Sequence, residues 1–148
     1  MPSDRIEKQI VVKAPRAKVW RALTEAKQFA AWFGMEMEGE FQPGTGTWGV
    51  SRHPGYEGRF EMRIEEMTPE SRFSWRWHPG SPAVDYSQEP ATLVVFELSE
   101  VTEGTLATVT ESGFEGLPPE RRQKAYEDNS QGWAIQLSAI GRYVEANP

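Results

Sequence analysis

Between Met35 and Phe114 the chain alternates apolar and polar residues, in segments that are separated by turn residues. Successive side chains of a strand point to opposite faces of a sheet, so a period of two indicates strands with one buried face. The alternation ends at Pro118-Pro119, and about 25 residues of helical periodicity follow. The clearest strand segments are RFEMRIEEM (59–67), RFSWRWH (72–78), TLVVFELSEV (92–101) and TLATVTESGF (105–114).

The first 34 residues add one strand and two short helices to this pattern. A β-branched, alternating segment predicts a strand from about Arg5 to Lys13, and Pro15 then opens a helix. A second short helix, KQFAAWFG, ends at Gly34. The order of strand, two short helices, about six antiparallel strands and one long helix predicts an α+β fold in a single domain over residues 1–148. The last helix is expected to cross the sheet from about Pro119 to Ala146.

Composition excludes several classes of partner. The formal net charge is -6 and the Lys and Arg residues form no cluster, so we expect no nucleic-acid partner. The N-terminus is charged and no apolar run is long enough to cross a bilayer, so we expect no signal peptide, no membrane partner and a cytoplasmic location. The absence of Cys excludes disulfides and thiol chemistry.

The long C-terminal helix has an apolar stripe that turns polar partway along. Trp133, Leu137, Ile140 and Val144 share one face of this helix. Further toward the N-terminus, Asn129, Ser130 and Gly132 replace the large apolar residues that a packed stripe requires. This part of the helix therefore faces either solvent or a space that is not filled by core side chains.

The inner face of the sheet, by contrast, is rich in aromatic residues. A strongly curved sheet that grips a long helix can leave a cavity lined by rings and a few polar groups. We therefore expect an internal pocket for a small apolar or aromatic molecule. The expected lining consists of Trp48, Phe60, Met62, Trp75, Trp77, Phe96, Val109, Glu111, Asn129, Ser130, Trp133 and Leu137.

Glu111 is the most informative polar residue of the expected lining. Alternation in LATVTES places it on the same face as Ala107 and Val109, which we expect to point inward. It then serves either as a polar anchor for a ligand or as a general acid or base. The alternative is that Glu111 lies in solvent at the end of its strand.

Other candidate constellations do not meet the requirements of their chemistry. His53 and His78 each precede Pro-Gly, which is typical of a strand end, and a metal site would need further ligands close by. The chain has no GxSxG nucleophile motif, and GTGTWG lacks the Lys and the following helix of a phosphate-binding loop. We expect no metal and no cofactor, and the chain shows no recognisable catalytic constellation.

Four stretches, taken together, resemble the SRPBCC (START/Bet v-like) superfamily, and most of all the homologues of the activator of heat-shock-protein-90 ATPase. They are IEKQIVVKAPRAKVWRALTEAKQFAAWFG, GRFEMRIEEMTPESRFSWRW, TLVVFELSEVTEGTLATVTESGF and QGWAIQLSAIGRYVE. The resemblance implies a helix-grip fold, in which a curved antiparallel sheet of about six to seven strands surrounds the C-terminal helix. It also implies an internal pocket in many members, but no single chemistry.

The resemblance leaves three hypotheses for function. The first is a ligand-binding domain, as a monomer or a homodimer, and the second is a cyclase, dehydratase or hydrolase that uses Glu111. The third is an interaction module of the co-chaperone type. The eukaryotic activators carry a separate N-terminal domain that contacts the chaperone, and here the first strand begins within the first ten residues. That difference argues against a chaperone partner.

Overall fold

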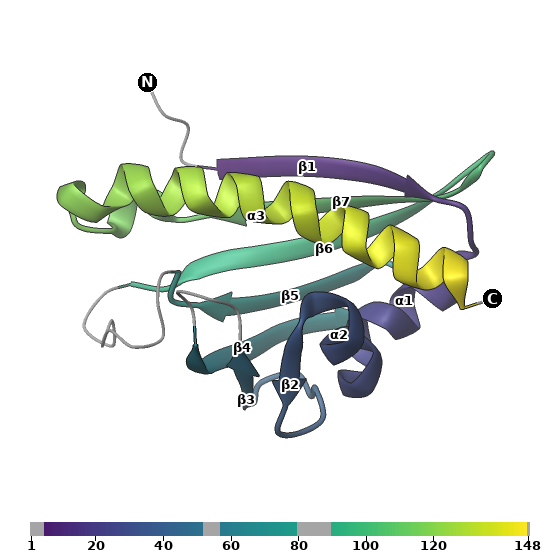
Figure 1. The fold of residues 1–148 in the computed structure, drawn as a ribbon, viewed down its shortest axis with the longest axis horizontal. Coiled ribbons are helices and arrows are strands. Elements are labelled where there is room, and N and C mark those ends of the chain that lie inside the picture. The colour runs from purple at the N-terminus through teal and green to yellow at the C-terminus, as the bar shows by residue number, and fades with distance from the viewer. Residues whose placement is uncertain (1–4, 52–56, 80–89, 148) are drawn as a thin grey trace.

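A computed structural model describes residues 5–51, 57–79 and 90–147. Its seven strands form one antiparallel sheet in the order β1-β7-β6-β5-β4-β3-β2. The sheet is curved, and the helices lie against one of its faces (Figure 1). The strands are β1 (Arg5–Val12), β2 (Met35–Met37), β3 (Gly46–Ser51), β4 (Gly58–Thr68), β5 (Arg72–Trp77), β6 (Thr92–Val101) and β7 (Gly104–Ser112).

Three α-helices and one 3-10 turn complete the fold. The two short helices, α1 and α2, follow β1, and α2 contacts both the edge strand β2 and the long helix α3. Gly34 ends α2 in the left-handed conformation (φ 85°), which glycine adopts without the steric cost that other residues have. The helices are α1 (Arg16–Thr24), α2 (Ala26–Phe33), η1 (Phe114–Gly116) and α3 (Pro119–Ala146).

Strand β5 shows how alternation separates the two faces of the sheet. Phe73 and Trp75 are fully buried on the inner face. On the outer face, Arg76 pairs with Glu65 at 2.8 Å and Arg72 pairs with Glu97 at 3.3 Å. Aromatic residues therefore gather under the helices, and charged residues face solvent.

Helix α3 lies along β1 and crosses the inner face of the sheet (Figure 1). Its C-terminal half packs closely, because a Cβ added to Gly141 would lie 3.2 Å from Ile10 Cδ1. Its buried positions are Ala125, Trp133, Leu137, Ile140, Gly141 and Val144. The stripe is therefore interrupted between Ala125 and Trp133, where the sequence turns polar.

The structure confirms the predicted fold class, the two short helices after the first strand and the bounds of the C-terminal helix. Within the described ranges, no helix is long and apolar enough to cross a membrane.

Trp133 is the residue through which α3 contacts the aromatic core. It is 3% exposed, and its ring centroid lies 5.7 Å from that of Phe96 and 6.2 Å from that of Trp75. We predict that Trp133→Ala lowers the free energy of unfolding by about 3–5 kcal/mol, because it leaves a large cavity in a packed site. Denaturant unfolding followed by circular dichroism measures this change.

Ile135 provides the matched control on the same helix, since its side chain is 66% exposed. Ile135→Ala should change the free energy of unfolding by less than about 0.5 kcal/mol. If Trp133→Ala cost no more than this control, the packing of Trp133 against the sheet would be contradicted.

Candidate functional site

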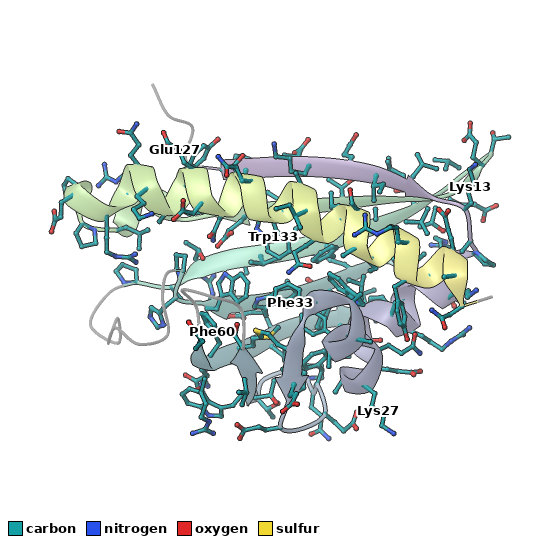
Figure 2. The ribbon with its side chains drawn as sticks, in the orientation of Figure 1. Lys13, Lys27, Phe33, Phe60, Glu127 and Trp133 are labelled. Atoms are coloured by element: carbon teal, nitrogen blue, oxygen red, sulfur yellow. The ribbon has the colours of Figure 1, made fainter. Side chains whose placement is uncertain are left out.

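A pocket of about 220 Å³ lies between α3, the end of α2 and strands β2 to β5. Trp133, Phe33 and Phe60 point into the space between the helices and the sheet, whereas Lys13, Lys27 and Glu127 lie at the periphery (Figure 2). The pocket is lined by Phe33, Met35, Ser51, Phe60, Trp77, His78, Pro79, Asp128, Asn129, Gly132, Trp133 and Gln136.

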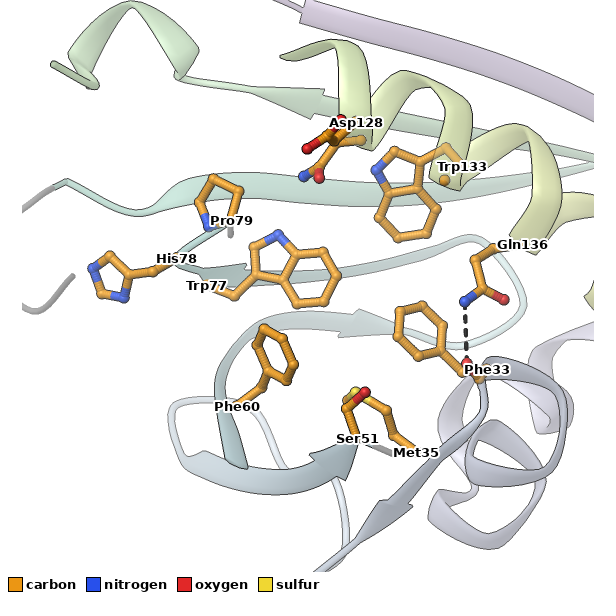
Figure 3. A pocket seen from close by; sticks show the side chains of 12 residues that line it. Phe33, Met35, Ser51, Phe60, Trp77, His78, Pro79, Asp128, Trp133 and Gln136 are labelled. Atoms are coloured by element: carbon orange, nitrogen blue, oxygen red, sulfur yellow. Dashed lines mark hydrogen bonds between the residues drawn. The ribbon is translucent and has the colours of Figure 1, made fainter. Parts of the chain in front are cut away.

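Four rings, which we call the aromatic floor, form the centre of this lining: Phe33, Phe60, Trp77 and Trp133. The Trp77 and Trp133 rings are stacked with centroids 5.9 Å apart. Phe33 lies 6.1 Å from each of them, and Phe60 lies 6.4 Å from Trp77. The rings stand side by side, and the other labelled lining residues surround them (Figure 3).

Glu111 lies behind the aromatic floor and is completely buried. Its Oε1 accepts hydrogen bonds from Trp133 Nε1 at 2.8 Å and from Asn129 Nδ2 at 2.9 Å. Its Oε2 accepts hydrogen bonds from Trp77 Nε1 at 3.0 Å and from Thr92 Oγ1 at 2.5 Å. One carboxylate thus fixes both indole rings of the floor, and it also holds the amide at the edge of the pocket.

The position of Glu111 follows from the alternation of β7. Ala107, Val109 and Glu111 are all fully buried, so the strand keeps its inward face to its end. β1 and β6 flank β7 on either side and pair Ile6 and Val94 with Glu111. Glu111 therefore lies on the inner face of the sheet and is not exposed at the end of its strand.

The polar interruption of α3 has two causes in the structure. Asn129 is a donor to Glu111, so a large apolar residue there would leave Oε1 with one donor fewer. Gly132 lines the pocket, and a Cβ added to it would have no neighbour within 4 Å. Neither position therefore contributes a large apolar side chain to the core. Asn129 makes a hydrogen bond instead, and Gly132 leaves open space.

Of the residues that the sequence predicted for the lining, four border the pocket: Phe60, Trp77, Asn129 and Trp133. Glu111 is one layer deeper. Five others are buried in the surrounding core without bordering the pocket, namely Met62, Trp75, Phe96, Val109 and Leu137. Ser130 is half-buried on α3 and does not border it either.

Trp48 does not face the pocket, contrary to our expectation. Its ring is 38% exposed, and the Arg59 guanidinium lies 4.5 Å from its centroid. The inward positions of β3 are instead Thr47, Gly49 and Ser51. At Gly49 the inner face is filled by Met35, whose Cε would lie 2.6 Å from an added Cβ.

Sequence reasoning missed eight residues of the lining, five of them at or next to the ends of α2 and of strands β2, β3 and β5, and three within α3. Phe33 and Met35 flank Gly34, and the Gln136 side-chain amide ties α3 to α2 by donating to the Phe33 carbonyl at 3.1 Å. The glycine at the end of α2 was the available signal, since it places two apolar residues on either side of a sharp turn. The missed residues are Phe33, Met35, Ser51, His78, Pro79, Asp128, Gly132 and Gln136.

Metal chemistry finds no support in the part of the chain that the structure describes, where His, Asp and Glu residues form no group able to hold an ion. His53 and most of the loop PGSPAVDYSQEPA (79–91), which we expected at the rim of a pocket, lie outside the described residues.

Comparison with protein families gives one decisive match. Residues 13–145 match the model of the family described as Activator of Hsp90 ATPase homolog 1-like protein. The chain belongs to this family. The match spans every element from α1 to α3, including all the residues that line the pocket. No curated protein matches the chain significantly by sequence.

Solved structures show the same fold. Protein MLL2253 from Mesorhizobium loti is 19% identical with a TM-score of 0.80, over 97% of this chain and 98% of that one. DynU16, from the dynemicin biosynthetic locus, is 25% identical with a TM-score of 0.75, over 97% of this chain and 48% of that one. An Aha1 dimer from Colwellia psychrerythraea is 19% identical with a TM-score of 0.73, over 95% of this chain and 96% of that one.

The hydrogen bonds of Glu111 predict a specific sensitivity to substitution. In Glu111→Gln one acceptor oxygen becomes an NH₂ donor that faces hydrogen-bond donors in a buried site. We expect the free energy of unfolding to fall by about 1–3 kcal/mol, the cost of a buried donor without a partner. Glu111→Leu should cost more, because four donors lose their acceptor.

Glu97→Gln is the matched control for this substitution. Glu97 is exposed on the outer face, where it pairs with Arg72. A surface pair contributes about 0–1 kcal/mol, so the control should be close to neutral. Equal stability of Glu111→Gln and Glu97→Gln in thermal and denaturant unfolding would contradict the role of the buried carboxylate.

Proposed function

We propose that this chain is a small-molecule-binding domain that takes an apolar or aromatic group into the pocket between α3 and the sheet. The aromatic floor supports the proposal most directly, because its four rings pack against one another and still border a cavity of about 220 Å³. Concave sites with apolar walls and a few polar groups are typical of ligand pockets.

The size of the cavity restricts the ligand. Ligand pockets typically measure about 300–1,000 Å³, so this one is small and accommodates a compact group or one end of a longer molecule. The polar groups at its border, such as Ser51, Asn129 and Gln136, can orient that group.

The floor is held in place before any ligand arrives. Trp77 and Trp133 are hydrogen-bonded to Glu111, and Trp133 is also packed against Trp75 and Phe96. Rings that are already ordered lose little conformational freedom on binding, and this reduces the free-energy cost of association. The buried carboxylate therefore contributes to binding through the rings that it positions.

A direct catalytic role for Glu111, the basis of the enzyme hypothesis, has less support. A general acid or base must come within hydrogen-bond reach of the reacting group. Both Glu111 oxygens are already occupied by two donors each, and the residue does not border the pocket. The co-chaperone hypothesis rests on family membership alone, and a homodimer rests on the Colwellia relative.

Gly132 allows a test in which the pocket is filled from within. Its added side chain would enter open space, so Gly132→Leu should fold and occupy the cavity. We expect an aromatic probe such as indole to change the amide chemical shifts of the wild type saturably. Gly132→Leu should weaken this binding at least tenfold. Two-dimensional NMR titration gives the affinity and locates the shifts around the aromatic floor.

Ala134→Leu adds the same side chain at an exposed position two residues away and should bind like the wild type. Gly132→Ala should be more stable than the wild type by about 0.5–1 kcal/mol, because glycine is unfavourable inside a helix. Binding that is equal in Gly132→Leu and Ala134→Leu would place the ligand elsewhere, and a panel of aromatic probes without any saturable shift would refute the pocket.

A further inference from the structure

The carboxylate of Glu111 is buried without a positive partner. Its four hydrogen-bond donors, from Trp77, Thr92, Asn129 and Trp133, are all neutral, and no ion pair joins it to a cation within the described residues. Buried charges in proteins are usually paired or bound to a metal, because removing an ion from water is costly. The four hydrogen bonds reduce the cost of burying this acceptor group.

The carboxyl group of Glu111 lies directly behind the aromatic floor. Both indole N–H groups point to the carboxylate, so the rings of Trp77 and Trp133 separate it from the pocket. An aromatic ring carries negative potential on its face and positive potential at its edge. An acceptor at the indole N–H binds this positive edge and increases the negative potential on the ring. The ring faces therefore attract a cation more strongly.

Among the described residues, Arg121 lies beside the lining, and its guanidinium donates to the Pro79 carbonyl oxygen at 3.0 Å. None of the described lining residues of the pocket is Lys or Arg, and Asp128 brings a second carboxylate to the rim. Asp128 is paired with Lys124 at 2.9 Å, so its contribution is partly neutralised. His78 also borders the pocket.

We infer that the pocket binds an organic cation, specifically an alkylated ammonium group that rests on the aromatic floor. The inference depends on the proposed ligand-binding function and names the class of ligand. Quaternary ammonium groups are recognised by cages of aromatic rings, with the cation within about 6 Å of the ring centroids. The compact volume of about 220 Å³ suits such a headgroup better than an extended hydrocarbon.

An alkylated ammonium fits this lining better than a metal ion or a primary ammonium. Both of those are strongly hydrated and need several oxygen ligands to replace their water. The floor offers Phe33, Phe60, Trp77 and Trp133, which replace no hydration shell but contact methyl groups well. N-methyl groups also gain from leaving water, as any apolar surface does.

The test compares choline with its neutral isostere 3,3-dimethyl-1-butanol, in which carbon replaces the charged nitrogen. Both are titrated into the protein at pH 8 and followed by two-dimensional NMR and tryptophan fluorescence, with indole as a neutral aromatic reference. We expect choline to bind at least tenfold more tightly than the isostere, with shifts at Trp77 and Trp133. In Glu111→Gln the preference should fall severalfold, while Glu97→Gln should keep it.

A second pair of variants covers the case in which Glu111→Gln does not fold. Trp77 is only half-buried, so Trp77→Phe and Trp77→Leu are both expected to fold. The preference for choline should be reduced in Trp77→Phe and lost in Trp77→Leu, whereas affinity for the isostere should change less.

The outcomes separate this inference from the proposed function. If the isostere or indole binds and choline binds no better, the cation preference is wrong and the pocket remains a neutral ligand site. If none of the three binds, both proposals fail. If choline binds more tightly but the preference is unchanged in Glu111→Gln and Trp77→Leu, the cation lies elsewhere and the inference is overturned.

Discussion

The buried carboxylate of Glu111 is the interaction on which the rest of this structure depends. It joins three adjacent strands and the long helix, since its donors come from β5 (Trp77), β6 (Thr92) and α3 (Asn129, Trp133) while Glu111 itself ends β7. A hydrophobic contact would tolerate a small rotation of α3 over the sheet, because apolar packing has no directional requirement. The two directed hydrogen bonds from α3, donated by Asn129 and Trp133, do not, so the register of the helix against the strands is fixed at this level.

The same network accounts for the pocket. A core packed only for stability closes its voids, because every unfilled volume loses contacts. Here Trp77 and Trp133 are drawn by their N–H groups toward Glu111, and their rings cannot collapse into the space beneath Gly132. The space persists because the residues that border it are held from the opposite side. Stability and an open site, which usually compete, are therefore provided by the same side chains.

The fold could be predicted almost completely from the sequence, and the site only in part. Alternation identified the inward face of β5 and β7, so Trp75, Trp77 and Glu111 were placed correctly with respect to the sheet. It could not distinguish a residue that borders the cavity from one packed beside it, because Trp75 and Trp77 share a face and differ only in depth. Trp48 was misplaced because side-chain size suggested burial, whereas the inner positions of β3 are Thr47, Gly49 and Ser51. Phe33 and Met35, the lining residues from α2 and β2, depend on the geometry of the turn at Gly34. Periodicity in the sequence does not describe that turn.

Family membership explains the architecture, but the chemistry of the site has to be argued from its residues. Members of one fold family share the helix grip over the sheet, and the same fold supports unrelated functions. The site of this chain combines a buried carboxyl group, two indoles that donate to it edge-on and a glycine that leaves space above them. The three features depend on one another. Without the carboxyl group the indole N–H groups lack an acceptor, and a large side chain at position 132 would occupy the space over the indole rings. General packing requirements would favour apolar residues at positions 111, 129 and 132. The residues found there serve the site instead, so they are more informative about function than the fold is.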